Sequence, residues 1–253
     1  MSGNASAWKA DGSGWRARIG LLTHDDNTVS ESEFWTMAPA GVSIHSARVL
    51  FNDLRTFADP PGVDRAAGQL ARLPLQAIVF AFTTGSYLLG KSGEQALVAR
   101  LEQHSNGIPV VMPAAAAVAA FHAVQAGRIA LVHAPFFTDE VDGKAVGYFE
   151  EHGFDVVQAS HVMPAETVPH PNLGTISSPA DIYEWVRSHT PNDAQAVFIA
   201  GNGYRSIGVI SALEEDLGIP VLNANQVALW YVLRKAGVLV GVDGYGQLFK
   251  RPL

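Results

Sequence analysis

Short apolar segments alternate with amphipathic segments along most of the chain. The apolar segments are rich in valine, isoleucine and alanine, as in strands that a parallel sheet buries on both faces. They predict strands at Arg18–Leu22, Ser43–Val49, Ala77–Ala81, Ile108–Met112, Ile129–His133, Asp155–Ala159, Ala196–Ala200 and Pro220–Leu222. The amphipathic segments predict helices at Glu94–His104, Ala114–Ala126, Asp142–His152, Asp181–His189, Ser206–Leu217 and Asn225–Ala236. This alternation predicts βαβ units and an α/β fold.

The order of these segments also repeats. RIGLL at Arg18 returns as RIALV at Arg128, 110 positions later, and QAIVFAF returns as QAVFIAG. GIPV at Gly107 returns at Gly218, and each copy precedes a helical pattern. We therefore expect two pseudo-symmetric parallel-sheet lobes, with the chain crossing between them twice. The predicted division is 17–115 plus 225–253 for the first lobe, 116–224 for the second, and 1–16 for a flexible N-terminal lead-in.

The site is expected in the cleft between the lobes. Ligands of open parallel sheets bind beyond the carboxyl ends of the strands. Two facing lobes would bring four such loops together, at Thr23–Thr28, Phe82–Tyr87, His133–Glu140 and Gly201–Ser206. The prediction depends on this convergence and on no single motif.

Two of these loops are rich in hydrogen-bond donors. Thr83, Thr84 and Ser86 offer hydroxyls at a helix start, which suits a carboxylate or phosphate, although the same hydroxyls also serve as helix caps. Asn202, between two glycines, has a similar ambiguity, because such a triplet also forms a tight turn. The equivalent placement of the two loops in the repeats favours a shared anion site.

The other two loops supply an amide, aromatic rings and histidines. Asn27 can bind a carboxylate without adding charge, or cap the next helix. Phe136 and Phe137 suit either an apolar part of a substrate or core packing. His24 and His133 are the nearest titratable side chains, and each could instead be a structural histidine at a strand end.

The composition narrows the classes of function. A net charge of −7 argues against nucleic acid or an anionic membrane as a partner, and no apolar run is long enough to span a bilayer. The start of the chain has no signal-peptide pattern, so a cytoplasmic location is expected. The chain has no cysteine, which excludes disulfides and thiol catalysis. Nine scattered histidines and no phosphate-binding or dinucleotide motif predict no metal and no cofactor.

Three segments resemble the maleate cis-trans isomerases and arylmalonate decarboxylases of the aspartate/glutamate racemase superfamily. They are NTVSESEFWTMAPAGVSIHSARV from Asn27, FAFTTGSY from Phe80, and GNGYRSIGVISALEEDLGIPVLNANQVALW from Gly201. The resemblance implies two lobes whose facing loops carry a cysteine each. Those cysteine positions fall here on Phe82 and Gly201, so both thiols are missing.

The resemblance also implies roles for particular residues. Thr83 and Thr84 match a carboxylate-holding pair, backbone N–H groups near Asn202 match the donors of the second loop, and Phe137 replaces a carboxylate-binding tyrosine. The candidate catalytic residues are Thr83, Thr84, Gly201 and Asn202. The candidate substrate-binding residues are His24, Asn27, Phe82, Ser86, Phe136, Phe137, Gly203 and Tyr204.

The expected function is cofactor-independent chemistry on a small carboxylic acid through an enediolate-like intermediate in an oxyanion hole. A lyase resembling arylmalonate decarboxylase is favoured, with water, His24, Tyr204 or another group as proton donor. The alternatives are an isomerase or racemase with a non-cysteine acid and base, and a carboxylate-binding protein without catalysis. A homodimer is the family expectation. A Gly201→Cys variant is expected to place a sulfur facing the bound α-carbon.

Overall fold

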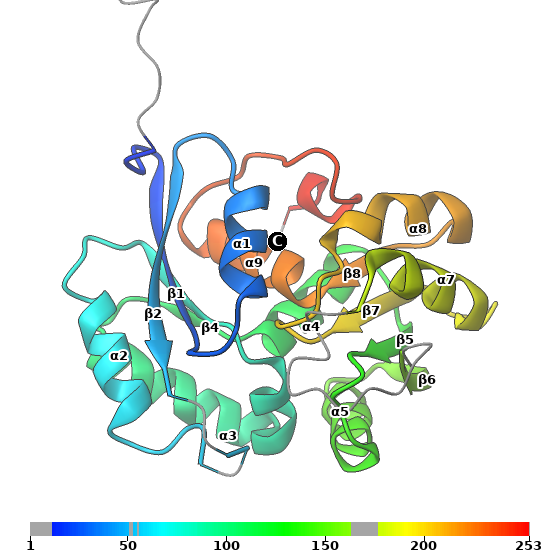
Figure 1. Ribbon diagram of the computed structural model, residues 1–253, viewed down its shortest axis with the longest axis horizontal. Coiled ribbons are helices and arrows are strands. Elements are labelled where there is room, and N and C mark those ends of the chain that lie inside the picture. Colours follow the sequence, from blue (N-terminus) through cyan, green and yellow to red (C-terminus); the bar gives the residue numbers. More distant parts are fainter. Residues whose placement is uncertain (1–11, 51–52, 55, 163–176, 253) are drawn as a thin grey trace, which may run out of the picture.

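The structure is a computed structural model that describes residues 12–50, 53–54, 56–162 and 177–252 (Figure 1). Every strand predicted from the sequence is present, and β4 is shorter than its predicted segment. The strands are Ala17–His24 (β1), Val42–Val49 (β2), Ala77–Phe80 (β3), Val110–Val111 (β4), Arg128–His133 (β5), Asp155–His161 (β6), Ala196–Ala200 (β7) and Val221–Asn223 (β8).

The predicted helices are also present, with several changed boundaries. The α-helices are Val29–Met37 (α1), Gly62–Leu70 (α2), Thr83–His104 (α3), Pro113–Ala123 (α4), Asp139–Glu151 (α5), Pro179–His189 (α7), Ile210–Leu217 (α8) and Ala224–Lys235 (α9). Short 3-10 helices lie at Ile207–Val209 (η2) and Leu248–Lys250 (η3). Helix α3 starts well before the predicted Glu94 and is interrupted at Gly90, whose φ of 66° is not helical. The predicted helix at 206–217 is η2 followed by α8.

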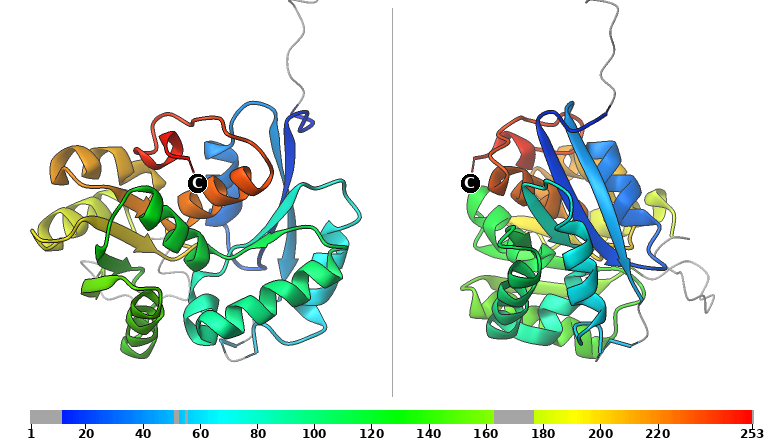
Figure 2. Two further views of the ribbon diagram at one scale, coloured as in Figure 1. Left: turned by 180° about the vertical axis from the view of Figure 1, so that it is seen from behind. Right: turned by 90° about the vertical axis from the view of Figure 1, so that its left-hand side faces the viewer.

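The strands form two parallel sheets with the same order. The first is β2-β1-β3-β4 and the second is β6-β5-β7-β8. Adding four to each strand number of the first sheet gives the second, so the predicted two-lobed repeat is confirmed. The two sheets are separate in space, as Figures 1 and 2 show. Strand β7 is buried at every residue, as expected for a parallel strand covered on both faces.

Helix α9 links the two sheets. It contacts β1, β3 and β4 of the first sheet, and β7 and β8 of the second, and lies between them in Figure 1. It starts at a capping box in which Asn223 and Gln226 satisfy each other's backbone N–H groups. Because α9 contacts both lobes, the division of the chain at residue 225 stays a prediction.

Two hydrophobic clusters form the core. The larger contains residues of both sheets, such as Leu21 and Leu131, together with Trp230 of α9. The smaller packs α2 and α3 against the other face of the first sheet, through residues such as Leu22 and Phe80. Leu21 and Leu22 enter different clusters because successive side chains of a strand point to opposite faces. Within the described residues, no helix has the length and apolarity that crossing a membrane requires.

The predicted lead-in lies mostly outside the described residues. Of that segment only residues 12–16 are described. There the backbone N–H of Arg16 donates to the carbonyl of Gly41 at 2.8 Å, which attaches this end to the turn before β2.

Candidate functional site

The four predicted loops meet at the loop after β7. Asn202 in this loop accepts a hydrogen bond at its side chain from Thr83, after β3. Asn27, in the loop after β1, has its Nδ2 3.9 Å from the position that a Cβ on Gly203 would take. Phe136, after β5, lies 3.3 Å from the position that a Cβ on Gly201 would take. The predicted convergence is therefore confirmed. That these loops bind an anion stays a prediction.

Thr83 directs two donors at one oxygen. Its backbone N–H lies 2.8 Å, and its hydroxyl 2.6 Å, from Oδ1 of Asn202, and all three groups are buried. Two donors that converge on one acceptor oxygen are the geometry of an oxyanion hole. In this structure the acceptor is the chain's own amide oxygen.

A network of buried hydrogen bonds fixes the other end of the Asn202 amide. Its Nδ2 donates to Oδ1 of Asn225 at 2.8 Å, and Nδ2 of Asn225 donates to Oε2 of Glu33 at 2.6 Å. The other carboxylate oxygen of Glu33 accepts from the backbone N–H groups of Ser206 at 3.1 Å and Ile207 at 3.4 Å. This hydrogen-bond network thus joins α1 of the first lobe, the start of α9 and the loop before η2.

Glu33 is a buried carboxyl with an altered affinity for its proton. Burial raises the pKa of Glu33 to about 7, and the hydrogen bonds from Asn225, Ile207 and Ser206, with the charge of Arg205, lower it only partly. The group therefore titrates near neutral pH.

Sequence reasoning missed Glu33 and Asn225, although one signal was available for Glu33. Val29, Ser30, Glu33 and Met37 recur at helical spacing and form the buried face of α1. A carboxyl on such a face needs buried partners, and those partners prove to be the network above.

Gly201 has little room for a side chain. Its φ of 120° lies in a region that L residues rarely adopt, and a Cβ there would come within 3.0 Å of the Ala134 Cβ and 3.3 Å of the Phe136 ring. That the sulfur of Gly201→Cys would face a bound α-carbon stays a prediction, and the geometry adds that the substitution is strained. The new side chain would be strained and directed against the loop after β5.

The same geometry predicts the cost of any side chain at this position. Gly201→Ala should lower the free energy of unfolding by about 1–3 kcal/mol, because it combines backbone strain with a close contact. Gly203→Ala is the matched control, since its Cβ would meet only Asn27 Nδ2, at 3.9 Å. Urea denaturation of both variants checks this. Equal losses for the two glycines would contradict it.

His24, Asn27 and Phe82 occupy different places around the first lobe. Oδ1 of Asn27 accepts from the backbone N–H groups of Val29 and Ser30, which is the helix-capping alternative, and its Nδ2 donates to the Ser30 hydroxyl at 2.9 Å. The rings of His24 and Phe82 are 4.2 Å apart, and Phe82 packs against the smaller hydrophobic cluster. Burial lowers the pKa of His24 to about 4, against the charges of Asp26 and Asp25, which raise it.

The aromatic residues after β5 form one side of the meeting point. Phe137 is buried and stacks on His133 with ring centroids 4.7 Å apart, while Phe136 is 44% exposed. Tyr87, one turn after Thr83 on α3, lies 5.9 Å from the His133 ring. Phe136 thus remains open to solvent beside Gly201, whereas Phe137 packs in the core.

Three further candidates also have defined surroundings. The hydroxyl of Ser86 donates to Glu94 at 2.6 Å. Thr84 is buried, and its hydroxyl makes no hydrogen bond within the described residues. Tyr204 is fully buried, and burial raises its pKa well above the ordinary value.

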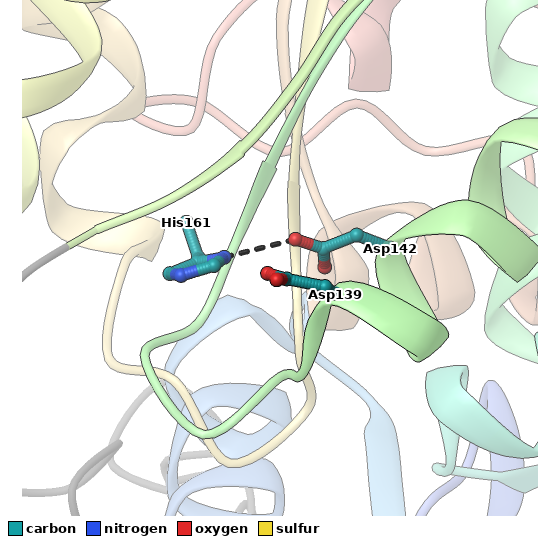
Figure 3. A group of neighbouring side chains, drawn as sticks. All are labelled: Asp139, Asp142 and His161. Carbon is teal, nitrogen blue, oxygen red and sulfur yellow. Dashed lines mark hydrogen bonds and ion pairs between the residues drawn. The ribbon is translucent and has the colours of Figure 1, made fainter.

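Asp139, Asp142 and His161 form a cluster between the start of α5 and the end of β6 (Figure 3). Their ligand atoms lie within 4.8 Å of one another, a spacing that a metal ion could bridge. Both oxygens of Asp142 already accept from histidine, from His133 at 2.7 Å and from His161 at 2.9 Å. Burial raises the pKa of Asp142, but these hydrogen bonds and charges leave it below the ordinary value. We interpret the cluster as a carboxylate, Asp142, hydrogen-bonded to two histidines, with Asp139 beside it. The absence of a metal site stays a prediction.

Comparisons with known proteins agree with this architecture. The family model described as arylmalonate decarboxylase matches residues 61–249. A maleate isomerase of Nocardia farcinica is 25% identical over 251 residues, which cover 92% of this chain and 96% of that protein. A maleate isomerase of Pseudomonas putida is 25% identical over 246 residues, covering 91% and 96%.

Solved structures have the same fold. The maleate isomerase of Pseudomonas putida S16 with maleate superposes with a TM-score of 0.83 at 20% identity, covering 92% of this chain and 97% of that one. An arylmalonate decarboxylase gives 0.79 at 17% identity, covering 92% and 99%. The Nocardia farcinica isomerase with a covalently bound succinylcysteine intermediate gives 0.79 at 22% identity, covering 92% and 98%.

Fold and site together define a two-lobed α/β enzyme whose polar loops meet between the lobes. Because the family model matches most of its length, the chain belongs to the arylmalonate decarboxylase family. The relatives are enzymes, an arylmalonate decarboxylase and maleate isomerases, and this chain lacks any cysteine.

Proposed function

We propose that the protein is a cofactor-independent lyase that removes CO₂ from a small malonate-like acid through an enediolate. The observation that carries the proposal is the pair of Thr83 donors directed at one oxygen, 2.8 Å and 2.6 Å away. Such donors stabilise the negative charge that develops on a carboxyl oxygen when the neighbouring carbon gains an electron pair.

A substrate carboxylate would take the place of the Asn202 amide oxygen. Both are acceptor oxygens of similar size, but hydrogen bonds to an ionised carboxylate are roughly twice as strong as those to a neutral amide. This difference in hydrogen-bond strength favours the exchange and opposes the cost of displacing the buried amide.

The absence of cysteine favours decarboxylation over isomerisation. The succinylcysteine in the Nocardia farcinica isomerase is a cysteine adduct, and this chain has no cysteine with which to form one. Decarboxylation instead breaks the bond between the α-carbon and one carboxyl carbon. The electron pair stays behind as the enediolate, and one proton then adds to the α-carbon.

Water is the proton donor in this proposal. His24, whose pKa burial lowers to about 4, is neutral near pH 7 and has no second proton to give readily. Tyr204, whose pKa burial raises, is a weaker acid than a free tyrosine. Water can approach either face of the enediolate, so the product of a prochiral aryl malonate should be close to racemic.

The test measures CO₂ release, optical rotation and maleate absorbance on the same preparation. We expect CO₂ from an α-substituted aryl malonate, a nearly racemic product, and no loss of activity with iodoacetamide. Conversion of maleate to fumarate without CO₂ release would replace the lyase with an isomerase. Calorimetric binding of phenylacetate or malonate without turnover would make the protein a carboxylate-binding protein.

A further inference from the structure

The buried network between Thr83 and Glu33 has a fixed direction. A backbone N–H can only donate, and an ionised carboxylate can only accept. The two amides between these ends, Asn202 and Asn225, could each point either way by themselves. With a donor at one end and an acceptor at the other, each amide has one orientation that satisfies every bond.

We propose that Glu33 is a positioning residue of the candidate site, which acts through Asn225 to keep the amide oxygen of Asn202 on the Thr83 donors. The inference rests on the proposed function in one respect, namely that an acid binds at Thr83. It assigns Glu33 control over how readily that acid displaces Asn202.

The carboxylate is suited to this role because donors surround it. Ser206 and Ile207 direct backbone N–H groups at Oε1, and Asn225 directs its amide at Oε2. A glutamine at this position would place its NH₂ against one set of these donors. If it faced Asn225, that amide would turn, the Asn202 amide would turn in response, and its oxygen would leave Thr83.

Protonation of Glu33 has the same consequence. A carboxyl O–H on Oε2 needs an acceptor, and the nearby acceptor is Oδ1 of a reversed Asn225. The groups around Glu33 are the neutral amide of Asn225 on α9, the backbone N–H groups at the start of η2, and the charged Arg205 before it. At high pH the Asn202 amide oxygen thus occupies the Thr83 donors, and at low pH it leaves them available to a ligand.

The binding experiment uses phenylacetate, a carboxylate whose own charge does not change between about pH 6 and about pH 8.5. Calorimetry on the wild-type protein should give affinity about tenfold weaker at the higher pH, the equivalent of one to two net hydrogen bonds. Glu33→Gln should remove this pH dependence. Glu31→Gln is the matched control, because Glu31 lies on the same helix, is partly exposed and pairs with Arg48. If the affinity of Glu33→Gln for phenylacetate still depended on pH, the proposal would be overturned.

A second readout needs neither turnover nor ligand. The side-chain amide resonances of Asn202 and Asn225, followed by ¹⁵N NMR in the wild-type protein, should shift together as Glu33 titrates. Unchanged resonances across that range overturn the proposal even if Glu33→Gln fails to fold. Failure of every acid to bind would remove the proposed function, while the amide titration would still decide the role of Glu33.

Discussion

Replacing Asn225 with leucine should lower the free energy of unfolding by about 3–5 kcal/mol at about pH 8.5, because it removes a partner from a buried charge. Leucine has the same number of side-chain heavy atoms as asparagine, but its two methyl groups are bulkier than the planar amide, so part of the loss comes from packing. The variant loses the hydrogen bond to Glu33, the one from the side-chain amide of Asn202 and the one to the backbone carbonyl of Asn202. The Asn225 hydrogen bond lowers the pKa of Glu33, so its loss raises that pKa above the wild-type value of about 7. At about pH 8.5 Glu33 must then either remain ionised with only backbone hydrogen-bond donors or take up a proton.

The loss should shrink on acidification. The pKa of Glu33 is 4.5 in the unfolded chain and about 7 in the folded protein. The folded state therefore binds this proton more tightly, so the stability from this group is complete below pH 4.5 and is lost as the pH rises through about 7. That loss amounts to about 3 kcal/mol in the wild-type protein. At about pH 5 Glu33 is neutral, and Asn225→Leu should cost only about 1–3 kcal/mol.

Guanidinium denaturation at the two pH values checks both statements. Asn192→Leu is the control, because Asn192 is exposed in the turn before β7 and should change stability by less than about 0.5 kcal/mol at either pH. If Asn225→Leu had the same cost at both pH values, the network would not contain a titrating carboxyl.

The fold followed from local patterns because most of its strands are buried on both faces. AVFIA of β7 is apolar throughout, and the repeat of its surroundings at QAIVFAF placed β3 in the equivalent position. Helix α2 was not predicted, although a signal was present. Val63, Ala66, Ala67 and Leu70 recur at helical spacing in GVDRAAGQL and form its buried face. The two glycines of the segment lower its helix propensity, and packing against β2 and α3 supports it.

The site was predictable in position but not in detail. The repeat placed Thr83 and the loop of Asn202 opposite each other, and the structure brings them into direct contact. The direction of the Asn202 amide depends on its hydrogen bond to Asn225, 23 residues away. The direction of the Asn225 amide depends in turn on its hydrogen bond to Glu33, 192 residues away. No local pattern contains such information. The backbone angle of Gly201 was equally hidden, because a glycine is compatible with many angles.

Thr83→Val should lower kcat for decarboxylation of an aryl malonate by about 10²–10³-fold, the usual effect of deleting one oxyanion-hole donor. Valine keeps the shape of threonine and the backbone N–H, so only the hydroxyl that lies 2.6 Å from the acceptor oxygen is lost. The donor acts on charge that develops in the transition state, so KM should change much less than kcat. Thr83→Ser, which keeps the hydroxyl, should recover most of the rate.

Steady-state kinetics of these variants should be compared with Thr190→Val. Thr190 ends α7, and its hydroxyl donates to the carbonyl of Val186 within the same helix, so this control loses a hydroxyl remote from the meeting point of the loops. A Thr83→Val enzyme with the wild-type kcat would show that the convergent donors do not act on the reacting carboxylate. Equal losses in Thr83→Val and Thr190→Val would instead indicate a general effect of lost hydroxyls on the folded state. A loss confined to Thr83→Val, in kcat rather than KM, identifies the donor pair as the group that stabilises the enediolate.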